Sequence, residues 1–203
     1  YDASSVVSGR SGGGNAGAAA VCPKGTAGQV YELASPEQAE AAFGAGETLT
    51  ELVRLLFQNG AAKAYAVPAA DEEGYEAAFA ALEKVEDIAV VVCGSTELTV
   101  QQRLRDSVKR ASENRRERLA VAGGAEGETA EELVARAGEL NCERVALVPG
   151  GVRAAAAAAG AMAGETDPAV PLGGAELSGL TALEEDWNDK EIDSLILGGV
   201  TPL

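Results

Sequence analysis

Histidine is absent from this sequence of 203 residues. Imidazole is the usual general base near neutral pH and a frequent zinc ligand, so its absence excludes Ser-His-Asp catalysis, Cys-His catalysis and most zinc sites. We therefore predict that the protein is not an enzyme, that it has no catalytic residues, and that it holds neither a metal nor another cofactor.

Cysteines and long apolar runs are also scarce. The three cysteines, Cys22, Cys93 and Cys142, are widely spaced and odd in number, and they contain no Cys-x-x-Cys pair. They therefore predict buried, reduced thiols and no disulfide framework. No stretch reaches the roughly 18 consecutive apolar residues of a membrane span, and the first residues lack the basic flank and apolar core of a signal peptide. We expect no membrane insertion.

Basic residues are few: the sequence contains 16 basic and 32 acidic residues, which gives a net charge of −16. This charge repels a phosphate backbone, so nucleic acid is not an expected partner. Residues 103–118 are the exception, with a net charge of +4, while the rest of the chain sums to −20.

Two interpretations of this basic stretch remain open. It is either a solvated helix face or a contact for the acidic surface of another copy of the chain. Helical spacing places its cations opposite Leu104 and Val108, so we expect them to be exposed. The candidate inter-subunit contact residues are Arg103, Lys109, Arg110, Arg115 and Arg116.

Four short apolar runs dominate what the sequence does contain: Ala62–Val67, Ile88–Cys93, Leu119–Ala122 and Val145–Val148. They alternate with amphipathic stretches of helical period, which is typical of βαβ units. We therefore predict an α/β fold with a mainly parallel sheet flanked by helices. Residues 1–34, rich in Gly, Ser and Ala, are expected to form a small strand and loop segment that packs on an α/β core domain of residues 35–203.

The stretches between the runs predict helices with recognisable ends. Ser35, followed by Pro36 and Gln38, predicts a capped helix that ends at Phe43, and Thr129 with Glu132 predicts a second capping box. The run Ala154–Ala159 can form a helix but offers little side chain to pack. Other helices are expected near residues 48–59, 72–85 and 99–113, and from 188 to 198, followed by a strand-like start at 200–203.

Candidate chemistry at the strand ends is sparse. Ser95 and Cys93 stand where a nucleophile could stand, but no Gly-x-Ser-x-Gly pattern accompanies Ser95 and no cation is assigned beside Cys93. We interpret Ser95 as a helix-capping residue and Cys93 as part of the core.

Two glycine patterns also lack their structural context. Gly12, Gly14 and Gly17 satisfy Gly-x-Gly-x-x-Gly, but no acidic residue ends a second strand about 20 residues later, so a flexible loop is expected. Lys24-Gly25-Thr26 is similar to the end of a phosphate-binding loop, yet Ala19 stands where that loop requires glycine.

Three segments carry a family resemblance. Residues 21–44 contain an apolar run, a Pro-x-Gly turn and a short strand before a helix that ends at Phe-Gly. Residues 52–67 contain a helix that stops at Asn-Gly and is followed by a strand. Residues 75–92 contain a helix before an Asp-Ile-x-Val-Val strand. In order and spacing these segments resemble contractile phage tail sheath proteins, and the likeness spans most of residues 5–203.

The resemblance implies a subtilisin-like α/β domain without the protease's catalytic residues. It further implies a structural subunit that polymerises around an inner tail tube and contracts to drive the tube through a target envelope. The implied partners are other copies, the tube protein and a baseplate. Assembly is expected in the bacterial cytoplasm, as a component of a virion or phage-like tail particle.

The sequence departs from the family pattern at both ends, where we expect the terminal arms and the C-terminal sheath domain to be missing. A helix follows the Lys63–Val67 strand directly, as in minimal sheaths. The alternative from another functional class is a doubly wound α/β small-molecule-binding or hydrolase-like domain, which an ordered ligand at the strand ends would favour.

Overall fold

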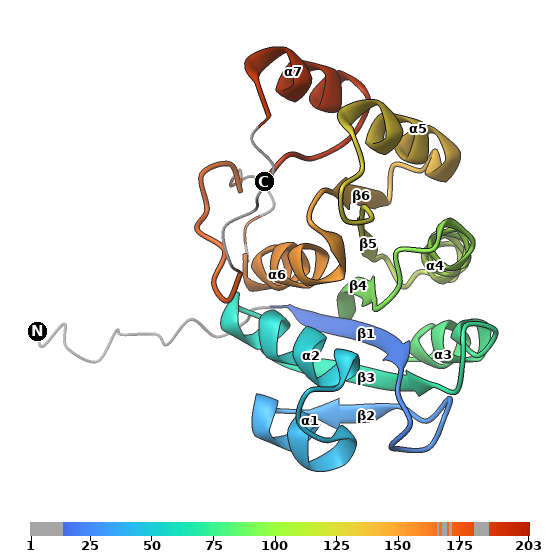
Figure 1. The fold of residues 1–203 in the computed structure, drawn as a ribbon. Coiled ribbons are helices and arrows are strands. Elements are labelled where there is room, and N and C mark those ends of the chain that lie inside the picture. The colour runs from blue at the N-terminus through green and yellow to red at the C-terminus, as the bar shows by residue number, and fades with distance from the viewer. Residues whose placement is uncertain (1–13, 166, 168–169, 171, 181–186) are drawn as a thin grey trace, which may run out of the picture.

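The computed structural model describes residues 14–165, 167, 170, 172–180 and 187–203, which form six strands and seven helices (Figure 1). The strands are β1 (Asn15–Val21), β2 (Tyr31–Leu33), β3 (Ala64–Ala69), β4 (Ile88–Cys93), β5 (Leu119–Gly123) and β6 (Val145–Val148). The helices are α1 (Pro36–Phe43), α2 (Thr48–Gln58), α3 (Tyr75–Leu82), α4 (Leu98–Glu113), α5 (Ala130–Leu140), α6 (Gly151–Gly164) and α7 (Asp189–Leu197).

The six strands form one sheet in the order β2-β3-β1-β4-β5-β6. β1 pairs in parallel with β3 and β4, and β5 and β6 continue the parallel array, whereas β2 at one edge is antiparallel to β3. The predicted α/β fold with a mainly parallel sheet is therefore confirmed. At the opposite edge, the strand-like start after α7 makes one parallel bridge, between Val200 and Leu147 of β6.

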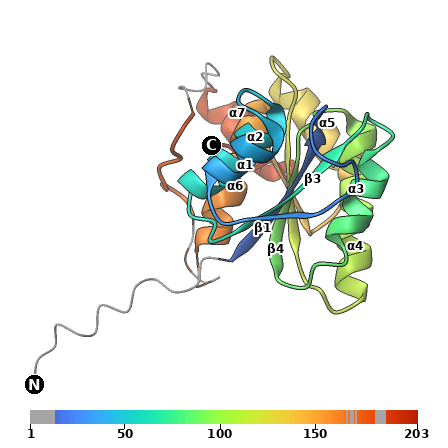
Figure 2. The ribbon, with the colours of Figure 1, turned by 90° about the horizontal axis from the view of Figure 1, so that it is seen from below.

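Helices cover both faces of the sheet (Figure 2). α2 and α6 pack on one face and α3 and α4 on the other, while α5 lies beside α4 and α7 packs against α5. Successive side chains of β1 point to opposite faces of the sheet. Ala18 therefore lies in the core beneath α2 and α6, and Ala19 in the core beneath α3 and α4. A third cluster joins α5, β6 and α7 around Leu133, Leu147 and Leu195.

The N-terminal part of the chain differs from the sequence prediction. Residues 1–34 are predicted to pack on the core, and residues 1–13 of this segment lie outside the described residues. In the described part, β1 is a central strand of the sheet and β2 is its edge strand. β1 escapes recognition because its small residues lack the β-branched and aromatic side chains that usually mark strands. Those small residues suit a strand that α2 and α6 approach from one face and α3 from the other. Gly17 is also close to the neighbouring strand, because a Cβ there would lie 3.3 Å from both Ile88 Cδ1 and Val91 Cγ2 of β4.

Helix α6 is closely packed despite its alanine run. Residues 154–157 and Ala159 are buried, and α6 contacts β1, β4, β5 and α2. A Cβ on Gly160 would lie only 2.6 Å from the carbonyl oxygen of Leu56. The run forms a helix with little side chain, as expected, and its small side chains let α6 touch the sheet and α2 together.

The two predicted capping boxes have different outcomes. In α5 the box is complete, because Thr129 Oγ1 accepts from the Glu132 N–H and the Glu132 carboxylate accepts from the Thr129 N–H at 2.8 Å. In α1 the Ser35 side chain caps no helical N–H; its hydrogen bond to Glu37 instead lowers the pKa of that carboxyl. The Gln38 side chain accepts from the backbone N–H of Ala34 and not from that of Ser35, so the predicted capping box of α1 is wrong.

Candidate functional site

A doubly wound sheet places its ligand crevice at the carboxyl ends of the strands, where the connections switch faces. Without the antiparallel β2, the order β3-β1-β4-β5-β6 has this form, and the switch lies between β1 and β4. Gly94, directly after β4, donates its N–H to the carbonyl oxygen of Ala19 at 2.8 Å. A Cβ on Gly94 would lie 2.6 Å from Cβ of Ala20 and 3.0 Å from Cγ2 of Thr48. Direct packing therefore closes the point where a ligand would enter.

A polar network closes the neighbouring carboxyl ends of β4 and β5. Gln101 of α4 is fully buried, and its Nε2 donates to the carbonyl oxygen of Gly123 at 2.8 Å. Arg136 of α5 donates to Gln101 Oε1 at 3.2 Å and to the carbonyl oxygen of Thr96 at 2.7 Å. Glu128 accepts from Arg136 Nε at 3.0 Å. These groups satisfy one another and the backbone, so they hold the edge together and are not aimed at a ligand.

None of these three side chains is among the candidates predicted from sequence. Gln101 shares the buried side of α4 with Leu104 and Val108, and a polar residue on that side is a usable signal. Arg136 carries a weaker signal, as a basic residue in a helix rich in glutamate.

The two possible nucleophiles serve the structure. Ser95 Oγ accepts from the Glu97 N–H at 3.1 Å. Glu97 itself is the N-cap of α4 and no side chain caps this helix, so the predicted capping role of Ser95 is wrong. Cys93 is buried, and its thiol donates to the carbonyl oxygen of Ser95 at 3.5 Å. Burial raises the pKa of Cys93 to about 11, which disfavours the reactive thiolate. Cys22 is buried as predicted, whereas Cys142 is half-buried.

We expect Cys93 to resist alkylation in the folded protein at pH 8. A pKa of about 11 against an ordinary 9.0 lowers its thiolate fraction roughly a hundredfold, and burial restricts access further. Iodoacetamide labelling followed by peptide mass spectrometry should find Cys142 modified first and Cys93 only after unfolding. Because the folded state keeps this proton more tightly, the thiol's stabilising contribution is complete below pH 9 and falls as the pH rises toward 11. Rapid native labelling of Cys93 would contradict its place in the core.

The glycine patterns do not form phosphate sites. Gly17 lies inside β1 and Gly14 directly precedes it, so the pattern is not a turn from a strand into a helix; Gly12 lies outside the described residues. Residues 24–26 follow β1 but lead to β2. Both patterns therefore lack the following helix N-terminus that binds phosphate.

Three of the five basic candidates are engaged within the chain. Arg110 pairs with the Glu83 carboxylate at 2.9 Å, and Arg116 donates to the carbonyl oxygen of Glu83 at 2.7 Å. Arg103 donates to the carbonyl oxygen of Glu72 at 3.0 Å. Arg110 is exposed, as expected, whereas Arg103 and Arg116 are half-buried. All three reach residues at the two ends of α3, because α3 packs beside α4.

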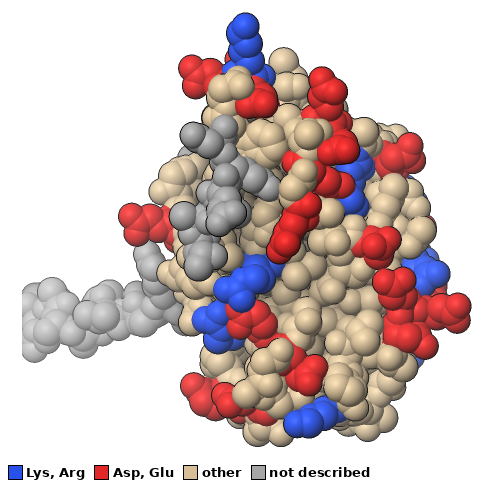
Figure 3. Space-filling model, in the orientation of Figure 1, with Lys and Arg blue, Asp and Glu red and all other residues tan. Residues whose placement is uncertain are grey.

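Lys109 and Arg115 differ from those three. Both are exposed, and neither side chain has a hydrogen-bond or ion-pair partner among the described residues. Arg118 is buried and donates to the carbonyl oxygens of Leu82 and Val85, at 2.9 Å and 2.6 Å, just where α3 ends. Burial and the charge of the neighbouring Arg116 lower the pKa of Arg118. The basic stretch thus leaves two free cations among the described residues. Acidic side chains are widely spread over the face of the molecule drawn in Figure 3.

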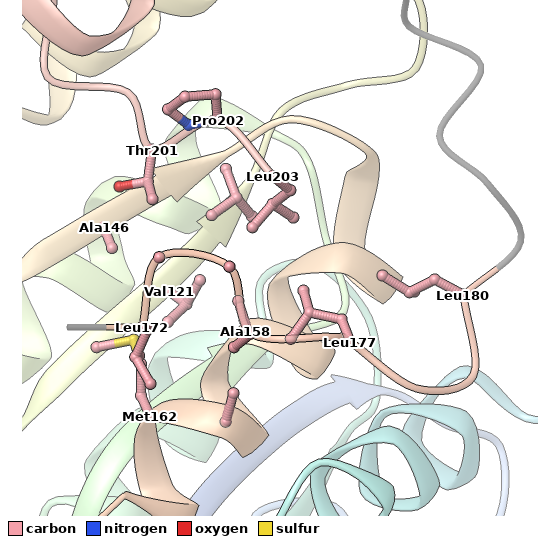
Figure 4. A pocket seen from close by; sticks show the side chains of 15 residues that line it. Val121, Ala146, Ala158, Met162, Leu172, Leu177, Leu180, Thr201, Pro202 and Leu203 are labelled. Carbon is pink, nitrogen blue, oxygen red and sulfur yellow. The ribbon is translucent and has the colours of Figure 1, made fainter. Parts of the chain in front are cut away.

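An apolar pocket of about 670 Å³ lies away from the carboxyl edge. It opens over the α6 face of β5 and β6, between Val121, Ala146 and Met162 (Figure 4). Its other walls include Leu172, Leu177, Leu180 and Leu203. None of the described side chains that line it is titratable. Apart from the Thr201 hydroxyl, the described residues that line the pocket offer no group for acid–base or nucleophilic chemistry.

None of the helices in the described residues combines the length and apolar character needed to cross a membrane. The same part of the chain contains no group of three or more cysteine or acidic side chains placed to hold a metal ion.

Residues 69–203 match the family described as the phage tail sheath protein central domain. No curated protein matches the sequence. The fold is similar to the anti-feeding prophage helical sheath in its contracted state, with 16% identity and a TM-score of 0.63 over 95% of this chain and 58% of that chain. A chain of the six-fold symmetrised baseplate of the same prophage is 17% identical, with a TM-score of 0.49 over 68% of this chain and 41% of that one.

The chain thus spans 58% of the length of the sheath chain to which its fold is similar. The family match, residues 69–203, covers more than half of the 203 residues. This protein therefore belongs to the phage tail sheath protein family, as the sequence resemblance predicts.

Proposed function

We propose that this chain is the α/β core of a contractile sheath subunit, which polymerises around an inner tail tube and contracts against a baseplate. The family match over residues 69–203 carries the proposal, and the similarity in fold to a contracted helical sheath over 95% of the chain supports it. Its partners are other copies, the tube protein and the baseplate. It assembles in the bacterial cytoplasm as part of a virion or phage-like particle.

The work of such a subunit is mechanical, and the closed carboxyl edge suits it. Direct packing at Gly94 and the network around Arg136 occupy the region where an α/β enzyme keeps its substrate. The competing function, a doubly wound small-molecule-binding or hydrolase-like domain, lacks its crevice there. Such a core can move as a rigid body while it exchanges contacts with its neighbours. Rigid-body rotation of subunits is one established kind of large conformational change.

Electron microscopy of the full-length protein tests this function. Tubes or rings are expected, and a protein that stays monomeric at all concentrations would contradict it. We further propose that the basic stretch contacts other copies through ion pairs, so assembly should weaken as salt rises from about 0.1 M to about 1 M, where the screening length falls to about 3 Å. Assembly that is unchanged across this range would leave the cations as a solvated face.

We also expect catalytic silence. The chain has no histidine, and Ser95 and Cys93 are engaged in backbone hydrogen bonds. Esterase, protease and phosphatase substrates should give no turnover above a buffer control. Turnover that disappears in Ser95→Ala or Cys93→Ala would overturn this expectation.

A further inference from the structure

Helix α7 presents a stripe of acidic and apolar side chains that nothing in the described chain covers. Asp189, Asp193 and Leu197 recur every four residues and therefore lie on one side of the helix. Leu197 is 90% exposed and its neighbour Ile196 is 57% exposed, whereas Leu195 is buried against β6 and α5.

The aspartates of this stripe are free to meet a partner. Both are exposed, and no hydrogen bond or ion pair joins Asp189 or Asp193 to another described residue. The third acidic residue of α7, Glu191, is occupied, since its carboxylate accepts from the Asn188 N–H at 2.9 Å in the capping box. Lys190 lies about 100° from Asp189 around the helix, because an α-helix has about 3.6 residues per turn.

The complementary surface is the end of α4. Lys109 and Arg115 are the exposed cations that α3 leaves without a partner, and they lie in the net-positive stretch of an otherwise acidic chain. Within one copy the two surfaces do not meet, because α5 lies between α4 and α7 (Figure 1). Each copy has a net charge of −16, so most of its surface repels the acidic stripe of another copy. The end of α4 is the main region that attracts the stripe.

We propose that the α7 stripe of one copy docks on the end of α4 in a second copy. Asp189 and Asp193 face Lys109 and Arg115, and Leu197 lies along the aliphatic stems of the two cations. The two surfaces differ, so the contact is head-to-tail and can repeat into a ring or an open helix. The proposal rests on the proposed sheath function and names the surfaces that join its copies.

Charge reversal in the full-length protein tests this contact. Variants Lys109→Glu/Arg115→Glu and Asp189→Lys/Asp193→Lys are each expected to raise the critical concentration for assembly tenfold or more, which is about 1.4 kcal/mol. An equimolar mixture should recover assembly, because each mutant surface then meets an oppositely charged surface on the other variant. Leu197→Ser should also weaken assembly, without a change in its salt dependence. Sedimentation of polymer and electron microscopy measure the result.

Matched variants control for net charge. Lys24→Glu/Lys84→Glu changes the charge as Lys109→Glu/Arg115→Glu does, and Glu72→Lys/Glu73→Lys matches the α7 pair; all four residues are exposed. These controls should assemble like the parent. Circular dichroism of each variant excludes unfolding as the cause of a loss.

The outcomes separate the contact from the function. A parent that forms tubes, together with reversal variants that assemble equally well or are not rescued by mixing, would overturn the α4–α7 contact and leave the sheath function intact. A parent that never assembles would overturn both.

Discussion

Replacing Gly160 with alanine is expected to lower the free energy of unfolding by about 3 kcal/mol. The new Cβ would lie 2.6 Å from the carbonyl oxygen of Leu56 and 2.8 Å from Cβ of Asn59, so α2 and α6 must move apart. Alanine normally favours a helix over glycine by about 0.5–1 kcal/mol, but this gain is smaller than the cost of overpacking. Urea unfolding followed by circular dichroism measures the change, and the thermal midpoint should fall by roughly 5–10 °C.

Gly138→Ala is the matched control. Gly138 lies in α5 with no atom near the position of a Cβ, so the same substitution there should stabilise the protein by about 0.5 kcal/mol. Equal stability of Gly160→Ala and the parent would mean that the close approach of α2 and α6 does not hold in solution.

The parts of the fold that the sequence predicts are those with strong local patterns. β4 is found because Ile88–Cys93 is an apolar run rich in β-branched residues. The start of α5 is found because Thr129 and Glu132 form a capping box. The close packing of β1 and α6 is not predicted, for one shared reason. Both are rich in alanine and glycine, whose small size matters because it lets neighbouring elements approach closely. That information is tertiary and has no local period.

The candidate site follows the same division. The missing histidine and the sparse chemistry at the strand ends predict that the protein is not an enzyme, but not that Gln101 and Arg136 close the edge. Similarly, the sequence gives the net charge of residues 103–118 but not their contacts. Arg110 pairs with the carboxylate of Glu83 and Arg116 donates to its carbonyl oxygen, and Glu83 directly follows α3. Composition gives the total charge, whereas only the packing of α3 on α4 determines which cations remain free.

Arg136→Met is expected to be the most destabilising substitution at the carboxyl edge. Arg136 and Glu128 form an ion pair with side chains only 12% and 17% exposed. Removal of the guanidinium leaves the Glu128 carboxylate in a poorly solvated place, and the acceptors on Gln101 and Thr96 lose their donor. Loss of one partner of a buried pair typically costs about 3–5 kcal/mol, and we expect the lower half of that range because some solvent reaches both groups.

The double variant Glu128→Gln/Arg136→Met separates charge burial from loss of packing. Glutamine keeps an oxygen that can accept the Ala125 N–H, which Glu128 now binds at 2.9 Å, but carries no charge to bury. If the unpaired carboxylate causes most of the loss, the double variant should be more stable than Arg136→Met by at least about 1 kcal/mol, because replacing both partners of a buried pair is often close to neutral. A double variant no more stable than Arg136→Met would instead show that the lost hydrogen bonds of Arg136, to the carbonyl oxygen of Thr96 and to Gln101 Oε1, cause most of the loss. Guanidinium chloride is unsuitable here because its cation can occupy the vacated position, so urea unfolding should be used for the comparison.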